Sequence, residues 1–192
     1  MNWKYLRHCS WLDTRARFVA ATPARGTLLD LGSSDGETLN HFAELRPDLR
    51  LCSADKFGHP ENYPPGCDFQ RCDFVQDKLP WPDRSVDAIT CMHVVEHLDD
   101  LQNLLAEIAR LLKPGGRVYF ETPHSKTIDL PSAKGKFTLN FYDDPTHVRV
   151  VTMTELAEKL SRTTLQLGAT GISRNWIFAA AHPCFSLLPE SR

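Results

Sequence analysis

A chain of 192 residues is long enough for one domain with a full core, and 42% hydrophobic and 24% charged residues are typical of a globular protein. The formal net charge of -2 gives no electrostatic reason to expect a nucleic acid as partner. No apolar run is long enough to span a membrane, and charges stand where a signal peptide needs its apolar core, so we expect a cytoplasmic protein.

The first 26 residues form the first region of the predicted organisation. They carry five Lys and Arg residues against one Asp, and apolar residues follow helical spacing from about Ser10. We expect a helix that caps the site or the edge of a sheet. The alternative is a basic surface for an anionic substrate or for membrane headgroups.

A turn rich in glycine and serine follows the first predicted strand, which runs from Thr27 to Leu31. From about Asp35 the apolar residues recur at helical spacing. Glycine lets the backbone bend sharply and lie close to a ligand, which the first N–H groups of the next helix then face. A strand, a glycine turn and a helix in this order are typical of the start of a nucleotide-binding α/β domain.

Polar residues follow several further predicted strands at the point where each strand ends. Periodicity predicts strands at 49–54, 68–72, 85–92 and 117–121, and an amphipathic helix over 101–112. Asp55 follows the second strand about twenty residues past the glycine turn, where an acid can accept hydrogen bonds from ribose hydroxyls. The carboxyl ends of parallel strands are where open sheets bind ligands, so the order of these features predicts one ligand crevice.

With these features in this order, the sequence resembles the class I S-adenosylmethionine-dependent methyltransferases, in particular their small bacterial members. The resemblance covers roughly residues 27–123, with weaker support to about residue 181, and rests on the strings LLDLGSSDG, CSADKF, RCDFVQDKLPWPDRSVDAI, HVVEHLDD and LLKPGGRVYFETP. It implies S-adenosyl-L-methionine as the cofactor. It also implies a Rossmann-like, doubly wound α/β fold whose seven-stranded sheet is mostly parallel with one antiparallel strand.

The same resemblance implies a role for each cofactor-binding residue. The methionine half of the cofactor is expected against Asp30, Gly32, Ser33, Ser34 and Gly36. The ribose is expected at Asp55 with Lys56 beside it, the adenine at Asp73 and Phe74, and the sulfonium near His93. The middle position of the turn is usually glycine in this family, and Ser34 fits there if its φ angle is ordinary.

The rival use of such a fold is a nicotinamide-dependent dehydrogenase. That function needs three glycines in G-x-G-x-x-G spacing, so that a pyrophosphate can lie on the helix N-terminus. Here the spacing is Gly32-x-x-x-Gly36, and Asp35 places an anion where the pyrophosphate belongs. A cofactor with a cationic sulfonium and a zwitterionic amino-acid tail fits this acidic turn better.

Residues 123–150 form a long segment after the last predicted strand, and a loop of this length is usually functional or disordered. Its centre is too rich in aromatic and hydrogen-bonding groups for a disordered linker. Its Asp-Pro-Thr-His-Val-Arg string is similar to one in bacterial methyltransferases, several associated with glycan or secondary-metabolite assembly. We therefore expect this segment on the acceptor side of the site.

Attack by an acceptor hydroxyl needs a group that removes its proton, and a histidine near neutral pKa suits that task. We predict His147 as the base and His124 as the second candidate, with Asp144 orienting an imidazole and Tyr142 shaping the acceptor pocket. The alternative is that Asp144 and His147 cap the next helix and hydrogen-bond the loop to itself.

The HVVEH string, residues 93–97, also invites a metal interpretation. In the zincin motif H-E-x-x-H the Glu directly follows the first His, whereas here Glu96 directly precedes the second. Hydrogen bonding at the start of a helix is the favoured role, and we predict no metal. The six cysteines show no C-x-x-C spacing, which favours buried thiols in a reducing compartment.

The rest of the chain predicts a helix over 154–160 and an antiparallel hairpin of strands 164–169 and 175–181. The expected organisation is one domain, residues 1–192, in four parts. These are an N-terminal cap (1–26), a cofactor-binding core (27–122), an acceptor-side insertion (123–150), and a C-terminal helix and hairpin (151–181).

The function expected from this sequence is S-adenosylmethionine-dependent methyl transfer to an oxygen of a small-molecule or sugar-containing acceptor. The alternative within enzymes is N- or C-methylation, because a neutral amine needs little help from a base. An alternative of another class is a catalytically silent cofactor-binding or regulatory partner. No nucleic acid partner is expected, and neither the acceptor nor the oligomeric state can be read from the sequence.

Overall fold

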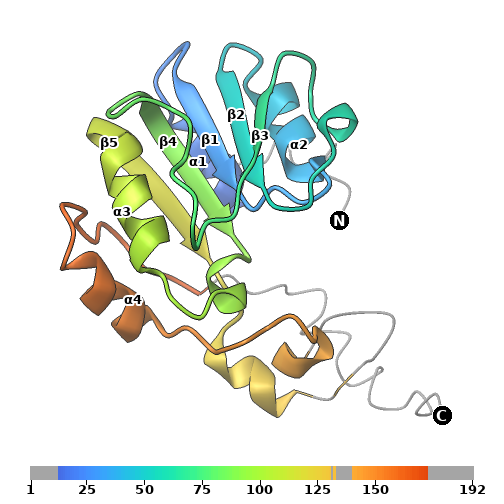
Figure 1. The fold of residues 1–192 in the computed structure, drawn as a ribbon, viewed down its shortest axis with the longest axis vertical. Helices are drawn as coiled ribbons and strands as arrows, with labels where there is room; N and C mark the ends of the chain where they lie inside the picture. The colour runs from blue at the N-terminus through green and yellow to red at the C-terminus, as the bar shows by residue number, and fades with distance from the viewer. Residues whose placement is uncertain (1–12, 131, 133–139, 173–192) are drawn as a thin grey trace.

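Five parallel strands form one sheet in the order β3-β2-β1-β4-β5 (Figure 1). The computed structural model describes residues 13–130, 132 and 140–172. The strands are β1 (Thr27–Leu31), β2 (Arg50–Asp55), β3 (Asp68–Arg71), β4 (Val86–Met92) and β5 (Leu112–Glu121). The strand order reverses between β1 and β4, and a crevice for a ligand forms at such a point, beyond the carboxyl ends of the strands.

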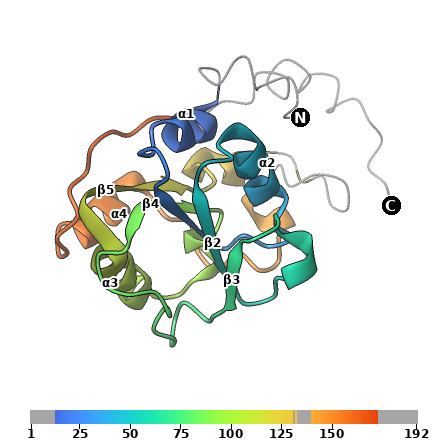
Figure 2. The ribbon, with the colours of Figure 1, turned by 90° about the horizontal axis from the view of Figure 1, so that it is seen from above.

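Helices cover both faces of this sheet, as expected for a doubly wound fold (Figure 2). On one face lie α1 (Thr14–Ala20) and α2 (Glu37–Leu45), and on the other lie α3 (Gln102–Leu111) and α4 (Met153–Leu160). Successive side chains of β1 alternate between the two layers, because Leu28 packs in the core beside α2 and Leu29 in the core beside α3. No helix in the described part of the chain is long and apolar enough to cross a membrane.

The predicted seven-stranded sheet with one antiparallel strand is wrong for the described residues, which form five strands, all parallel. Residues 164–169 are not a strand, and their proposed partner, residues 175–181, lies outside the described residues. The alternation of Leu165 and Leu167 suggested a half-buried strand. Only Leu165 packs against the core, and Leu167 is exposed, so the segment does not bury a strand face.

The start of β5 also differs from the expectation. The strand begins at Leu112, directly after α3, and includes Pro114 and Gly115, which lie between the predicted helix over 101–112 and the predicted strand over 117–121. Val86 pairs with Leu112 and Ala88 with Arg117, so one residue of β4 lies opposite four residues of β5. This bulge absorbs the turn within the strand, and Gly115 takes the positive φ of +80° that it requires.

The described segments between β5 and α4 lie beyond the carboxyl ends of the strands (Figure 1). They include two short 3₁₀ helices, η5 (Ser125–Asp129) and η6 (Phe141–Asp143), which contact each other. The fold therefore brings the described parts of the predicted acceptor segment to the same end of the sheet as the predicted cofactor residues.

Candidate functional site

The turn between β1 and α2 needs glycine at two positions. Gly32 and Gly36 both have φ +76°. A Cβ at Gly32 would stand 2.1 Å from Val94 Cγ2, and one at Gly36 would stand 2.9 Å from the Asn62 carbonyl oxygen. These glycines therefore combine a left-handed backbone with close packing, and the turn carries the first N–H groups of α2 into the crevice.

Ser34 does not have the ordinary φ angle that the sequence analysis required of it. Its φ is +49°, in the left-handed region that costs an L residue about 1–2 kcal/mol. Two contacts hold this conformation. The Ser34 N–H donates to Asp55 Oδ2 at 2.8 Å, and the Tyr63 hydroxyl donates to the Ser34 carbonyl oxygen at 2.9 Å. The turn keeps its shape without the family's usual glycine because its neighbours fix it.

Asp30 is a buried carboxyl group at the carboxyl end of β1. It is 2% exposed and accepts a hydrogen bond of 2.6 Å from the Thr90 hydroxyl on β4. Burial is the main cause that raises the pKa of Asp30 to about 7; the nearby Asp55 carboxylate acts in the same direction, against the hydrogen bond from Thr90 and the charge of Arg15. Such a carboxyl group is stabilised in its charged form by a cation brought into the crevice.

The carboxylate of Asp55, at the end of β2, organises the backbone around it. Its Oδ1 accepts the N–H groups of Phe57 at 2.7 Å and Gly58 at 3.0 Å, while Oδ2 accepts that of Ser34. A carboxylate offers about four acceptor sites, so three bonds leave room for about one more. The sequence predicted this residue for the ribose but did not reveal its bonds to two loops.

Asp73, predicted for the adenine, is already paired with Lys56, which was predicted beside the ribose. Lys56 Nζ lies 2.8 Å from Asp73 Oδ2, and this hydrogen bond is the main cause that lowers the pKa of Asp73. Phe74 is buried in the core beside α3, so little of its ring reaches the crevice. Phe57, which follows Lys56, is 77% exposed and was not predicted.

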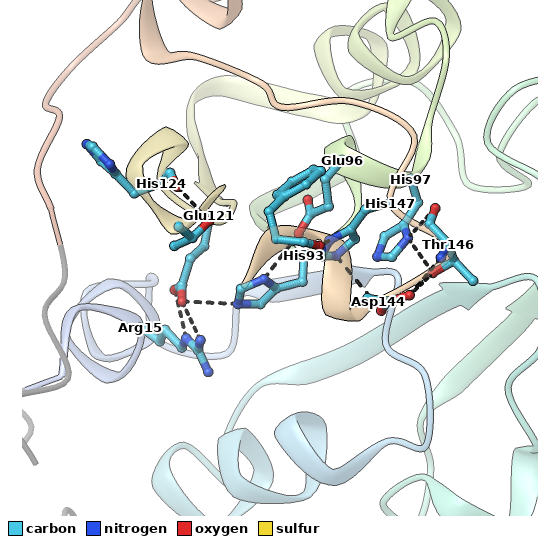
Figure 3. A network of polar contacts seen from close by, with 11 residues as sticks. Arg15, His93, Glu96, His97, Glu121, His124, Asp144, Thr146 and His147 are labelled. Carbon is cyan, nitrogen blue, oxygen red and sulfur yellow. Dashed lines mark hydrogen bonds and ion pairs between the residues drawn. The ribbon is translucent and has the colours of Figure 1, made fainter. Parts of the chain in front are cut away.

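His93 lies between two carboxylates at the end of β4 (Figure 3). Its Nδ1 is 3.2 Å from Glu96 Oε1, and its Nε2 is 3.4 Å from Glu121 Oε1. The hydrogen bonds to Glu121 and Glu96 raise the pKa of His93 to about 9 against the effect of burial. Arg15 of α1 pairs with Glu121 from the other side, and the pKa of Glu121 is lowered despite its burial.

Sequence reasoning missed Arg15 and Glu121 as partners of His93. Glu121 ends β5 as Asp55 ends β2, so its position offered a signal that was overlooked. Arg15 offered none, because its partner lies far away in the sequence.

The described parts of the acceptor segment place the four predicted catalytic residues differently. His147 is 5% exposed at its side chain, its Nδ1 lies 2.6 Å from the Phe141 carbonyl oxygen, and its Nε2 is 3.8 Å from Asp144 Oδ2. His124 caps η5 by accepting the Lys126 N–H, and its imidazole points away from His147 (Figure 3). Tyr142 is 67% exposed. The structure therefore joins His147 and Asp144 but not His124, and their catalytic roles stay predictions.

Comparison with known proteins shows which family the chain belongs to. A family model described as a methyltransferase domain matches residues 3–167. A ubiquinone/menaquinone biosynthesis C-methyltransferase of Desulfotalea psychrophila is 32% identical over 126 residues, covering 60% of this chain and 50% of that protein. A ubiquinone biosynthesis O-methyltransferase of Vibrio atlanticus is 29% identical over 106 residues, covering 53% and 45%. The chain thus spans about half the length of these curated relatives.

Solved structures agree with this assignment. The YcgJ protein of Bacillus subtilis is 25% identical with a TM-score of 0.58, covering 81% of this chain and 67% of that one. A methyltransferase of Haloferax volcanii, solved in complex with the activator Trm112, has a TM-score of 0.61 at 24% identity, covering 86% and 73%. This second likeness shows the fold alone.

Replacing Ser34 by Gly tests the strained turn. We expect Ser34→Gly to raise the free energy of unfolding by about 0.5–1 kcal/mol, because relief of the left-handed strain exceeds the added chain entropy of glycine. Urea denaturation measures the change. Ser33→Ala is the matched control and should destabilise, since its hydroxyl contacts Ser53 at 2.5 Å and Tyr63 at 3.0 Å. A loss of stability in Ser34→Gly would show that the turn rests in another conformation.

Proposed function

Since this chain belongs to the class I S-adenosylmethionine-dependent methyltransferases, we propose that it methylates an oxygen of a small-molecule or sugar-containing acceptor. The acidic crevice, in which Asp30 and Asp55 flank a left-handed glycine turn, supports the methyl donor. The observation that supports oxygen as the acceptor atom is His147, whose Nδ1 contacts the Phe141 carbonyl oxygen. When bound, the cofactor supplies a methyl group on a sulfonium, and attack by an acceptor oxygen forms the O–C bond and breaks the C–S bond.

The crevice residues fit this cofactor by their charge and shape. Asp30 is a buried carboxyl group next to the turn of Gly32 and Gly36, and its negative charge suits the ammonium of a methionine tail. Asp55 keeps room for about one ribose hydroxyl. Asp73, paired with Lys56 at 2.8 Å, is the candidate for the adenine amino group.

The acceptor side contains a histidine suited to proton transfer. If Nδ1 of His147 donates to the Phe141 carbonyl oxygen, the neutral ring carries its lone pair on Nε2. That lone pair can remove the proton of an acceptor hydroxyl, or it can bind a metal ion. Either role favours methylation of an oxygen over methylation of a neutral amine. The curated relatives include both C- and O-methyltransferases, so the methylated atom is tested by experiment.

The test of the proposed function is product formation from a panel of acceptors. We expect S-adenosylhomocysteine to accumulate with hydroxyl acceptors and not with matched amine or carbon acceptors. A protein that binds S-adenosylhomocysteine in calorimetry and turns over no acceptor supports the silent regulatory alternative. Tight binding of a nicotinamide dinucleotide in its place would overturn the cofactor assignment.

Variants of His147 separate its chemistry from its structural contact. His147→Ala should lower kcat by about 10²–10⁴-fold with S-adenosylhomocysteine affinity nearly unchanged, as for loss of a general base. His147→Asn keeps a donor for the Phe141 carbonyl oxygen and loses Nε2. It should be as slow as His147→Ala, and turnover near that of the wild type would make the residue a brace of the loop.

The raised pKa of Asp30, about 7, predicts a pH dependence of cofactor affinity. The ammonium of the cofactor favours the charged carboxylate, so affinity should rise about tenfold per pH unit below 7 and level off above it. The same shift makes folding less favourable as pH rises from 3.8 to about 7, because the folded state holds the proton longer.

Calorimetry of S-adenosylhomocysteine binding between pH 5.5 and 8.5 (roughly the range that brackets this titration) checks the prediction. Asp30→Asn should bind more weakly at high pH and show a flat profile. An unchanged slope in this variant would assign the titration to another group.

A further inference from the structure

The geometry points to a divalent transition-metal site formed by Glu96, His97 and His147. One potential ligand atom from each of these residues lies within 4.8 Å of the other two. Glu96 and His97 follow β4 in η4 (Val95–His97), and His147 comes from the acceptor segment. The sequence predicted no metal because the HVVEH order is not that of a zincin, but the third ligand lies outside that string.

Glu96 carries the clearest sign of a missing partner. It is 0% exposed, and one of its oxygens, Oε1, lies 3.2 Å from His93 Nδ1. Its other oxygen, Oε2, has no hydrogen-bond partner among the described residues. A buried carboxylate oxygen without a partner is costly, and a bound cation satisfies it directly.

Both histidines have a second contact that suits a metal ligand. His147 Nδ1 contacts the Phe141 carbonyl oxygen at 2.6 Å, and His97 Nδ1 contacts the Thr146 carbonyl oxygen at 3.1 Å. Metal-binding histidines usually donate their other N–H to such a carbonyl, which fixes the ring and leaves Nε2 to the metal. The two rings lie 4.8 Å apart between centroids (Figure 3).

The donor set selects the class of metal. Two imidazoles and one carboxylate suit zinc and neighbouring first-row metals, whereas magnesium and calcium prefer oxygen ligands. Metal–nitrogen bonds of about 2.0–2.1 Å place tetrahedral ligand atoms roughly 3.3 Å apart, so binding draws the side chains together by about 1.5 Å at most. Three protein ligands leave an open position, as in catalytic metal sites.

The open position has a use in the proposed reaction. Glu96 and His97 follow the carboxyl end of β4, beside His93, while His147 belongs to the acceptor segment. A metal here would bind the oxygen of an acceptor hydroxyl and lower its pKa, so that the proton could pass to water; His147 would then act as a metal ligand in place of the general base. This role rests on the proposed function, whereas the metal site itself does not.

The test is titration of the tag-free, chelator-treated full chain with Co²⁺, followed by visible absorption and calorimetry. We expect one equivalent to bind with nitrogen and oxygen ligation, Zn²⁺ to displace it, and Mg²⁺ to compete poorly. The cysteines that the structure describes as free are an internal check, because a thiolate charge-transfer band would place the metal on sulfur and overturn the proposal.

Variants locate the site and separate it from folding. Glu96→Gln, His97→Gln and His147→Asn should each weaken Co²⁺ binding by more than the 10–100-fold typical of losing a second-shell partner. His59→Ala removes an exposed histidine next to Glu61 and should bind as the wild type does. Circular dichroism of the metal-free proteins identifies any variant that has unfolded. The Co²⁺ affinities of the folded variants then test the site.

The outcomes distinguish this inference from the proposed function, because binding is measured without acceptor. Metal binding without turnover of hydroxyl acceptors would support the metal site and contradict its proposed role in the reaction. The metal site would be contradicted if the chain turned over hydroxyl acceptors but bound no Co²⁺. It would also be contradicted if all three ligand variants kept the Co²⁺ affinity of the wild type.

Discussion

The crevice depends on one carboxylate, that of Asp55. By accepting N–H groups from Ser34 and from Phe57 and Gly58, it joins the turn after β1 to the loop after β2. These two loops meet at the carboxyl edge of the sheet, where parallel strands leave their loops side by side. Without this carboxylate the left-handed Ser34 loses a bond that holds it. The acid predicted to recognise a ligand is therefore also the group that shapes the binding site.

A second chain of charges connects parts of the protein that are distant in sequence. Arg15 of α1, Glu121 of β5, His93 and Glu96 alternate in sign across the acceptor end of the crevice (Figure 3). Each group is paired, so three charges that are largely buried and a half-exposed imidazole are stabilised together. Beside this chain, His147 reaches Glu96 and His97 from the acceptor segment. The acceptor side is thus built from pairings between elements that are far apart in the sequence, and the cofactor side from a glycine turn and a loop that follow neighbouring strands.

This division explains what could be predicted from sequence. The strand ending in Asp30, the glycine turn and Asp55 were predictable, because periodicity, glycine and spacing are local signals. The φ of Ser34 was not, because it depends on Asp55 and Tyr63. The hairpin was wrong because strand pairing is non-local and residues 164–169 bury little. The meeting of His147 with Glu96 required the fold itself.

The bulge at the start of β5 has a consequence for the evolution of chain length. Side chains of a strand alternate between faces, so an inserted or deleted residue normally turns every later residue to the other face. Pairing resumes at Ala88 and Arg117, after four residues of β5 that lie opposite one residue of β4. Gains or losses within residues 113–116 can be absorbed there, and Glu121 keeps facing His93. A deletion between Arg117 and Glu121 cannot be absorbed in this way. It would turn Glu121 to the other face of the sheet, away from His93.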